Sequence, residues 1–264
     1  MIVIICKDYK KLSRKAATIV GSAIRNKPTL TLGLATGVTP RGTYSELIRL
    51  HREEGLDFSK IKTFNLDEYL GLPPSHPQSF YHQIHEMFLD HINILPQNTH
   101  IPDGTIDRNF DSYCEKYESL IRAAGGIDLQ ILGIGKTGHI GFNEPTSSLA
   151  SRTRLKTLTQ ETIATNQISF GPAEDVPACA ITMGIGTILE SSRILLLASG
   201  PEKASAVAAA IEGPLTASVT ASALQLHKDV VVIVDQEAAN ELRHQDYYKK
   251  VVEMTERLTP NRLQ

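Results

Sequence analysis

The amino-acid sequence predicts an α/β fold of three layers, in which a mostly parallel central sheet is covered by helices on both faces. Short apolar runs alternate along the chain with longer amphipathic segments. The apolar runs are continuous, which is typical of strands that are buried on both faces. Internal repeats, low-complexity segments and linker-like breaks in composition are absent from the sequence. We therefore expect a single domain over residues 1–264, with active groups at the carboxyl ends of the strands.

The expected strands and helices follow one another in a regular order. The expected strands are Ile2–Cys6, Leu30–Leu34, Ile61–Leu66, Leu129–Ile134, Ile194–Leu197 and Val230–Val234. The expected helices are Tyr9–Arg25, Arg41–His51, Phe80–His91, Phe110–Ala123, Lys203–Ile211 and Ala238–Leu242. Each helix is expected from amphipathic spacing or from its place between two apolar runs.

The charge balance and the cysteines argue against several classes of protein. The chain has 27 Lys and Arg against 29 Asp and Glu, so we expect no basic surface for nucleic acid. Cys6, Cys114 and Cys179 are widely separated and odd in number, which argues against a disulfide framework or a zinc ribbon and favours a reducing compartment. Neither a signal peptide nor a membrane span is expected. We expect a cytoplasmic protein that does not bind membranes.

The first motif, at residues 34–41, joins an expected strand to an expected helix. Thr36 and Gly37 form a short turn, Thr39 is the expected N-cap, and Pro40 is the expected first helical residue. Free backbone N–H groups and the positive end of the helix dipole would bind a phosphate there. A well-capped turn that binds nothing explains the motif equally well.

The second motif places two carboxylates, Asp67 and Glu68, directly after a strand. Because adjacent side chains diverge, we expect one of them to face the cleft. A partly desolvated carboxylate has a raised pKa and can take a proton from a carbon next to a carbonyl or imine. The alternative is a solvated acidic turn.

The third motif is a glycine-rich loop, at residues 133–145, that presents His139 and Glu144. The loop matches the spacing of a dinucleotide-binding turn, but Gly141 and Pro145 prevent the long helix that such a turn requires. A histidine enclosed by glycines, with a carboxylate five residues later, is a candidate for proton transfer near neutral pH.

Two further patterns carry weaker signals. If residues 151–157 are extended, Arg152, Arg154 and Lys156 share one face, which would suit either a phosphate or a solvated strand edge. His82 and His85 match neither order of a helical zinc motif, so we expect them on a helix surface and expect no metal site.

Taken together, four segments resemble the glucosamine-6-phosphate deaminase (isomerase) family, which shares a superfamily with the 6-phosphogluconolactonases. The matching segments are 33–40, 64–72, 138–145 and 151–154, and the strings N-L-D-E-Y and G-H-I-G-F-N-E-P are the most specific. The resemblance implies a Rossmann-like three-layer subunit that forms homo-oligomers, often hexamers. It also implies the conversion of glucosamine 6-phosphate and water to fructose 6-phosphate and ammonia without a cofactor.

The resemblance also assigns roles to individual residues. Asp67 matches the base that moves a proton from C2 to C1, His139 matches the group that opens the sugar ring, and Glu144 matches the carboxylate that holds this histidine. The expected ligands of the substrate phosphate are Thr36, Gly37, Val38, Thr39 and Lys203. The residues that match an allosteric site for N-acetylglucosamine 6-phosphate are Ser147, Arg154, Lys156 and Thr157.

Three residues depart from the family pattern. Thr137 stands where an acidic or amide residue usually assists ring opening, and we count it among the catalytic positions. Val38 stands in the phosphate loop, where a β-branched side chain would tolerate a positive φ poorly. Ile168 stands where a phosphate-binding arginine is usual. These departures leave two alternatives open: a relative that acts on another hexosamine phosphate or on 6-phosphogluconolactone, and a sugar-phosphate sensor without catalytic activity.

Overall fold

The main sheet of the computed structural model, which describes residues 1–172, 174–259 and 263, has seven strands, and all of its neighbouring strands are parallel. In spatial order the strands are β1 (Ile2–Cys6), β10 (Val230–Asp235), β9 (Arg193–Ala198), β6 (Leu129–Leu132), β2 (Thr31–Leu34), β3 (Lys62–Asn65) and β5 (Thr99–His100). The strands that follow β2 in the chain, β3 and β5, lie on one side of it. The strands that follow β6, β9 and then β10, lie on the other side, toward β1. The β2–β6 pair is therefore the switch point at which ligands of such sheets bind.

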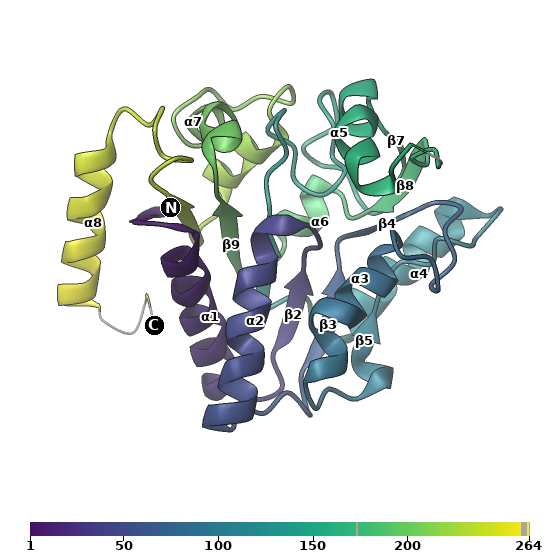
Figure 1. Cartoon of the computed structure of the whole chain (residues 1–264), viewed down its shortest axis with the longest axis horizontal. Coiled ribbons are helices and arrows are strands. Elements are labelled where there is room, and N and C mark those ends of the chain that lie inside the picture. Colours follow the sequence, from purple (N-terminus) through teal and green to yellow (C-terminus); the bar gives the residue numbers. More distant parts are fainter. Residues whose placement is uncertain (173, 260–262, 264) are drawn as a thin grey trace.

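Helices cover both faces of this sheet, as predicted (Figure 1). One face packs against α1 (Tyr9–Asn26), α2 (Val38–Glu54) and α3 (Phe80–Met87), and the other against α4 (Phe110–Ala123), α6 (Ile185–Leu189) and α7 (Ala204–Ile211). Alternate residues of β9 and β10 belong to the two cores, which explains why these strands are apolar except at Arg193 and Asp235. The predicted α/β class is confirmed.

A second, antiparallel sheet was not predicted from the sequence. It consists of β4 (Asp67–Tyr69), β8 (Cys179–Thr182) and β7 (Arg154–Thr157), in the order β4-β8-β7. The helix α5 (Gln160–Phe170) lies beside this sheet, at the edge of the molecule toward which β2 and β9 point (Figure 1).

Leu66 connects the two sheets. Its N–H donates to the carbonyl of Leu34 in the main sheet at 3.1 Å, and its carbonyl accepts from the N–H of Met183, just after β8, at 2.7 Å. One extended segment, formed by β3, Leu66 and β4, thus runs from the large sheet into the small one. This connection places Asp67, the residue after Leu66, above the carboxyl edge of the main sheet.

The prediction of a helix at Ala238–Leu242 is wrong, because turns follow β10 there. The segment is apolar because Ala238, Ala239 and Leu242 are buried, and burial alone does not make a helix. The last helix is α8 (Gln245–Leu258), which packs along β1 and has no fully buried residue. The 3₁₀ turns are Leu89–His91, Pro96–Asn98, Pro201–Lys203 and Thr220–Leu226.

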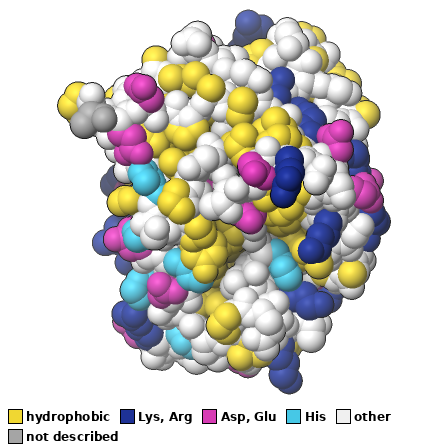
Figure 2. All heavy atoms as spheres, turned by 90° about the vertical axis from the view of Figure 1, so that its right-hand side faces the viewer, with side chains coloured by type: hydrophobic (Ala, Val, Ile, Leu, Met, Phe, Trp, Pro, Cys, Tyr) yellow, Lys and Arg dark blue, Asp and Glu magenta, His cyan; other side chains and the backbone are white. Residues whose placement is uncertain are grey.

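The surface agrees with the balanced composition. Figure 2 shows basic and acidic side chains interspersed over the face that it presents, rather than gathered into one basic patch. None of the helices in the described ranges is long and apolar enough to cross a membrane.

Glu68 ties the small sheet to α3. Its buried carboxylate accepts hydrogen bonds from the hydroxyl of Ser79 at 2.9 Å and from the backbone N–H groups of Tyr69, Phe80 and Tyr81 at 2.8–2.9 Å. Two of these donors belong to the first turn of α3, where N–H groups lack partners within the helix. The expectation that one member of the Asp67–Glu68 pair faces the cleft is confirmed, because Glu68 is turned toward the helix.

We expect Glu68→Gln to lower the free energy of unfolding by about 2 kcal/mol, because one oxygen acceptor replaces two and an NH₂ group faces buried donors. Urea unfolding followed by circular dichroism measures this loss. A change below about 0.5 kcal/mol would contradict the role of Glu68 as the buried link to α3.

Candidate active site

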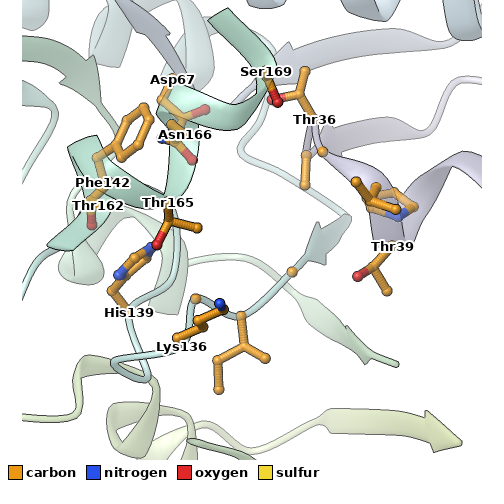
Figure 3. A pocket seen from close by; sticks show the side chains of 18 of the residues that line it. Thr36, Thr39, Asp67, Lys136, His139, Phe142, Thr162, Thr165, Asn166 and Ser169 are labelled. Carbon is orange, nitrogen blue, oxygen red and sulfur yellow. The ribbon is translucent and has the colours of Figure 1, made fainter. Parts of the chain in front are cut away.

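A cavity of about 640 Å³ lies at the carboxyl edge of the main sheet. Its walls include segments that follow strands of the main sheet and part of α5: residues 35–40 after β2; 66, 67 and 69 after β3; 133–137, 139, 141 and 142 after β6; 199, 200, 202 and 203 after β9; and Thr162, Thr165, Asn166 and Ser169 of α5. Figure 3 shows α5 spanning the cavity, with Ser169 beside Thr36 and Thr165 beside His139. The cavity thus occupies the position expected from the switch point.

The Thr36–Thr39 loop forms one wall, but its helix begins earlier than predicted. Gly37, with a φ of 108°, is the N-cap of α2, and Val38 is the first helical residue, so the prediction of Thr39 as N-cap is wrong. The positive φ falls on glycine, and the β-branched Val38 avoids it. The Val38 side chain is 79% exposed at the rim. Val38, Thr39 and Pro40, in the first helical turn, line the cavity, so the N-terminus of α2 lies where an anion site would use it.

Two tyrosine hydroxyls fix the ends of this loop. The buried hydroxyl of Tyr44 donates to the carbonyl of Ala35 at 2.7 Å and accepts from its N–H at 3.2 Å. On the other side, the hydroxyl of Tyr9 accepts from the N–H of Gly42 at 2.7 Å. The loop is therefore held from α1 and from within α2, so its N–H groups are set in place before a ligand arrives.

Asp67 lies in the wall opposite this loop, buried except for 7% of its surface (Figure 3). Burial is the main cause that raises the pKa of Asp67 to about 8, the negative charge of Glu68 adds to this effect, and the N–H of Phe142 opposes it. A carboxyl group with a pKa near the working pH can both take up and release a proton.

His139 lies beside a second carboxylate. Its Nδ1 is 2.8 Å from the hydroxyl oxygen of Thr137 and 3.3 Å from Oε2 of Glu144. The ring packs flat against Gly135, where an added Cβ would come within 2.2 Å of the ring. Since Nδ1 has these partners, Nε2 is the nitrogen available to a ligand, and Thr137 supplies one of the two partners of Nδ1.

Glu144 is ionised in this arrangement. Burial would raise its pKa, but hydrogen bonds from His139 and Thr162, the positive charge of His139 and the N–H of Thr159 together lower the pKa of Glu144 to about 2. A permanent carboxylate beside Nδ1 helps to orient the imidazole ring, as in other carboxylate–histidine pairs.

Lys203 is the expected phosphate ligand on the side of β9, and the structure places it in the cavity wall. It follows the turn at Ser199 and Gly200, which the buried carboxylate of Asp235 holds through the hydroxyl of Ser199 and the N–H of Gly200. Burial of the ammonium is the main cause that lowers the pKa of Lys203, and the positive charge of Lys136 adds to this effect. An anion bound beside Lys203 would favour its protonated form.

The four residues expected in an allosteric site lie outside the cavity wall. Ser147 is buried, and its hydroxyl has no hydrogen-bond partner among the described residues. Arg154 donates to Oδ1 of Asn143 at 2.9 Å, Lys156 is half-buried, and Thr157 is exposed at the end of β7. Residues 154–157 are extended, as the spacing of the cations suggested.

The α5 helix was missed in the sequence, although it contributes polar side chains to the site. Its lining residues Thr162, Thr165, Asn166 and Ser169 recur at helical spacing, but they are polar, so no hydrophobic periodicity marks the helix. Asn166 donates to the Tyr69 hydroxyl at 2.7 Å. Ile168 is 87% exposed and does not line the cavity.

Comparison with known proteins identifies the class to which this fold and site belong. A family model described as glucosamine-6-phosphate isomerases/6-phosphogluconolactonase matches residues 8–233. The chain therefore belongs to this family. Among solved structures, 6-phosphogluconolactonase from Trypanosoma cruzi superposes with a TM-score of 0.71 at 22% identity, covering 92% of this chain and 97% of that one, and so shares the fold.

Within the family, relatives of higher similarity are named glucosamine-6-phosphate deaminase. The chain is 51% identical to the enzyme of Thermoanaerobacter sp. (strain X514), with 93% of this chain and 97% of the relative covered. It is also 51% identical to that of Hahella chejuensis (strain KCTC 2396), with 98% of each covered. The structure of a monomeric glucosamine-6-phosphate deaminase superposes with a TM-score of 0.89 at 48% identity, covering 91% of this chain and all of that one.

The raised pKa of Asp67 predicts that this residue destabilises the fold as the pH rises. Between the pKa of an unfolded Asp, about 4, and the folded value of about 8, the folded protein binds the extra proton, so its stability falls with increasing pH. We expect Asp67→Asn to raise the melting temperature more at pH 8.5 than at pH 5.

Thermal melts at the two pH values measure this difference. The exposed Asp107→Asn, at a carboxylate that is 84% exposed, is the control and should show no such pH dependence. An equal effect of Asp67→Asn at both pH values would contradict the raised pKa.

Proposed function

We propose that this protein converts glucosamine 6-phosphate and water to fructose 6-phosphate and ammonia. The observation that supports the proposal is that Asp67, His139, the Thr36–Thr39 loop and Lys203 line one cavity, with Glu144 buried beside His139 (Figure 3). The reaction needs proton exchange at carbon, proton exchange at oxygen and an anchor for the phosphate. We assign the first to Asp67, the second to His139 with Glu144, and the third to the Thr36–Thr39 loop with Lys203.

His139 opens the sugar ring. Its available Nε2 moves a proton between the O1 hydroxyl and the ring oxygen, while the ionised Glu144 and the hydroxyl of Thr137 hold Nδ1. A hydrogen bond and one carboxylate are enough to orient the ring, which supports a catalytic position for Thr137.

Asp67 then moves a proton from C2 to C1 of the open-chain sugar. Removal of the C2 proton gives an enolamine, and return of the proton at C1 gives an imine at C2 that water hydrolyses to the ketone and ammonia. The low polarity around the carboxyl group keeps its pKa near the working pH, so one side chain serves both half-reactions.

The phosphate is anchored by Thr36, Gly37, Val38 and Thr39 together with Lys203. The N-terminus of α2 supplies backbone N–H groups and the dipole, and the two threonines supply hydroxyls. The family relatives of about 50% identity favour this hexosamine phosphate over 6-phosphogluconolactone as the substrate.

The first test replaces the carbon base. Asp67→Asn keeps the size and hydrogen bonding of the side chain but removes its basicity, so kcat should fall at least ~100-fold while the KM changes little. Ammonia release from glucosamine 6-phosphate measures the rate, with Asp107→Asn as the control.

Activity of Asp67→Asn within a few-fold of the wild type would refute the role of Asp67. A wild-type protein that binds the sugar phosphate by calorimetry but releases no ammonia would instead support the sensor alternative.

Ser147, Arg154, Lys156 and Thr157 are proposed to bind N-acetylglucosamine 6-phosphate as an effector. The proposal is supported by the position of the segment: Arg154 bonds to Asn143, the neighbour of Glu144, and the N–H of Ser147 donates to the carbonyl of Glu144 at 3.1 Å. A ligand that orders this segment would change the preferred position of Glu144 and, through Glu144, that of His139. The alternative is that these cations serve a subunit contact.

Substrate saturation curves with and without N-acetylglucosamine 6-phosphate distinguish the two roles. If the site is allosteric, the curves should separate by roughly 5- to 150-fold in half-saturating substrate, the range that a coupling of about 1–3 kcal/mol gives. Overlapping curves, together with no heat of effector binding by calorimetry, would leave only the structural role.

The whole chain is proposed to act as one domain, cytoplasmic and without a cofactor, and to assemble into homo-oligomers. One relative of 48% identity is described as monomeric, so the oligomeric state remains a prediction.

A further inference from the structure

The cavity wall has few positive charges for a substrate that carries a phosphate. Among the described residues that line the cavity, the Lys and Arg side chains are Lys136 and Lys203. The acidic Glu161 and Glu202 line the same cavity, and Glu202 interacts electrostatically with Lys203. A phosphate monoester carries a charge of about −1.5 to −2 at neutral pH, which one half-buried lysine beside a glutamate does not balance.

The helix above the cavity adds no cation. The sequence of α5, from Gln160 to Phe170, contains neither Lys nor Arg, and its cavity-facing side chains are neutral apart from Glu161. Further positive charge for the phosphate must therefore come from another wall.

Lys136 has the position to supply that charge. It lies on a tight turn that the N–H of Gly138 closes onto the carbonyl of Gly135 at 3.0 Å, and the N–H of Gly135 donates to the carbonyl of His139 at 2.9 Å. The turn fixes the backbone of Lys136 relative to His139. In the view of Figure 3, the Lys136 amino group lies between His139 and Thr39.

Lys136 also remains available to a ligand. Within the described ranges, neither Lys136 nor Lys203 forms a salt bridge with a carboxylate, and the Lys136 side chain is exposed. The two ammonium groups are close enough that the charge of Lys136 disfavours the protonated form of Lys203. The two like charges repel each other, and an anion bound between them would relieve the repulsion.

We propose that Lys136 is a second cationic ligand of the substrate phosphate, acting with Lys203 across the cavity from α5. The inference depends on the proposed function, because it assigns the phosphate of that substrate to this end of the cavity. It makes Lys136 a determinant of specificity for phosphorylated over unphosphorylated sugars, and assigns it no part in proton transfer.

Steady-state kinetics of Lys136→Gln with glucosamine 6-phosphate test the proposal. We expect KM to rise about tenfold and kcat to stay within about twofold of the wild type. The variant loses a contact that binds the substrate and the transition state equally, while the proton-transfer groups are intact. Lys136→Arg should keep most of the affinity. The matched control is Lys116→Gln, at an exposed lysine of α4 outside the cavity, which should leave KM unchanged.

Inhibition by inorganic phosphate gives a readout that an altered loop structure would not reproduce. Its inhibition constant should rise in Lys136→Gln by a factor similar to that of KM. Raising the ionic strength from about 0.02 to 0.2 M should reduce the difference in this inhibition constant between variant and wild type, because salt screens an exposed charge.

Each outcome separates this inference from the proposed function. A wild-type protein without deaminase activity would overturn the proposed function itself. An active wild type whose KM and phosphate inhibition are unchanged in Lys136→Gln would overturn only the role of Lys136. A fall in kcat at constant KM would also overturn it, since Lys136 would then act on His139 rather than on the phosphate.

Discussion

The two backbone hydrogen bonds of Leu66 are the constraint on which the site depends. A residue that bonds to the large sheet through its N–H and to the small sheet through its carbonyl cannot move independently of either. Asp67 follows directly, and Glu68 turns away to hold the first turn of α3. The placement of Asp67, the proposed carbon base, is thus determined by the connection between the two sheets. Backbone bonds of this kind hold a side chain more precisely than a free loop does.

Two carboxyl groups of the site, Asp67 in the cavity wall and Glu144 behind His139, have opposite pKa shifts. Burial without a cationic partner raises the pKa of Asp67, whereas the hydrogen bonds and positive charge around Glu144 lower the pKa of that residue despite its burial. One group therefore exchanges protons near neutral pH and the other remains a permanent anion. Such divergent environments for like groups are typical of acid–base catalysis. The fold creates this difference by bringing donors to Glu144 from Thr159 and Thr162, at the start of α5.

Much of this arrangement could be predicted from the sequence, because the parallel sheet is built from continuous apolar runs and its loops follow them directly. Asp67, His139 and Lys203 each come just after such a run, so their convergence follows from topology. The small sheet and α5 could not be predicted in the same way. Two strands of the small sheet, Asp67–Tyr69 and Arg154–Thr157, carry charged residues and lack the continuous apolar run that marks the strands of the main sheet. The α5 helix faces a polar cavity and therefore lacks apolar periodicity. Lys136 could not be singled out from the sequence, because a lysine in a turn has the same pattern whether it faces solvent or a ligand.

The contact between the His139 ring and Gly135 has a consequence for how the protein tolerates mutation. A methyl group at residue 135 would overlap the ring, so even the smallest side chain must displace the histidine from its partners. The position is only partly buried, and substitutions at such positions usually change stability little. Selection for folded protein alone would therefore accept many residues at position 135, whereas selection for turnover would accept only glycine. The variability of this one position across a mutant library would report which of the two properties had been selected.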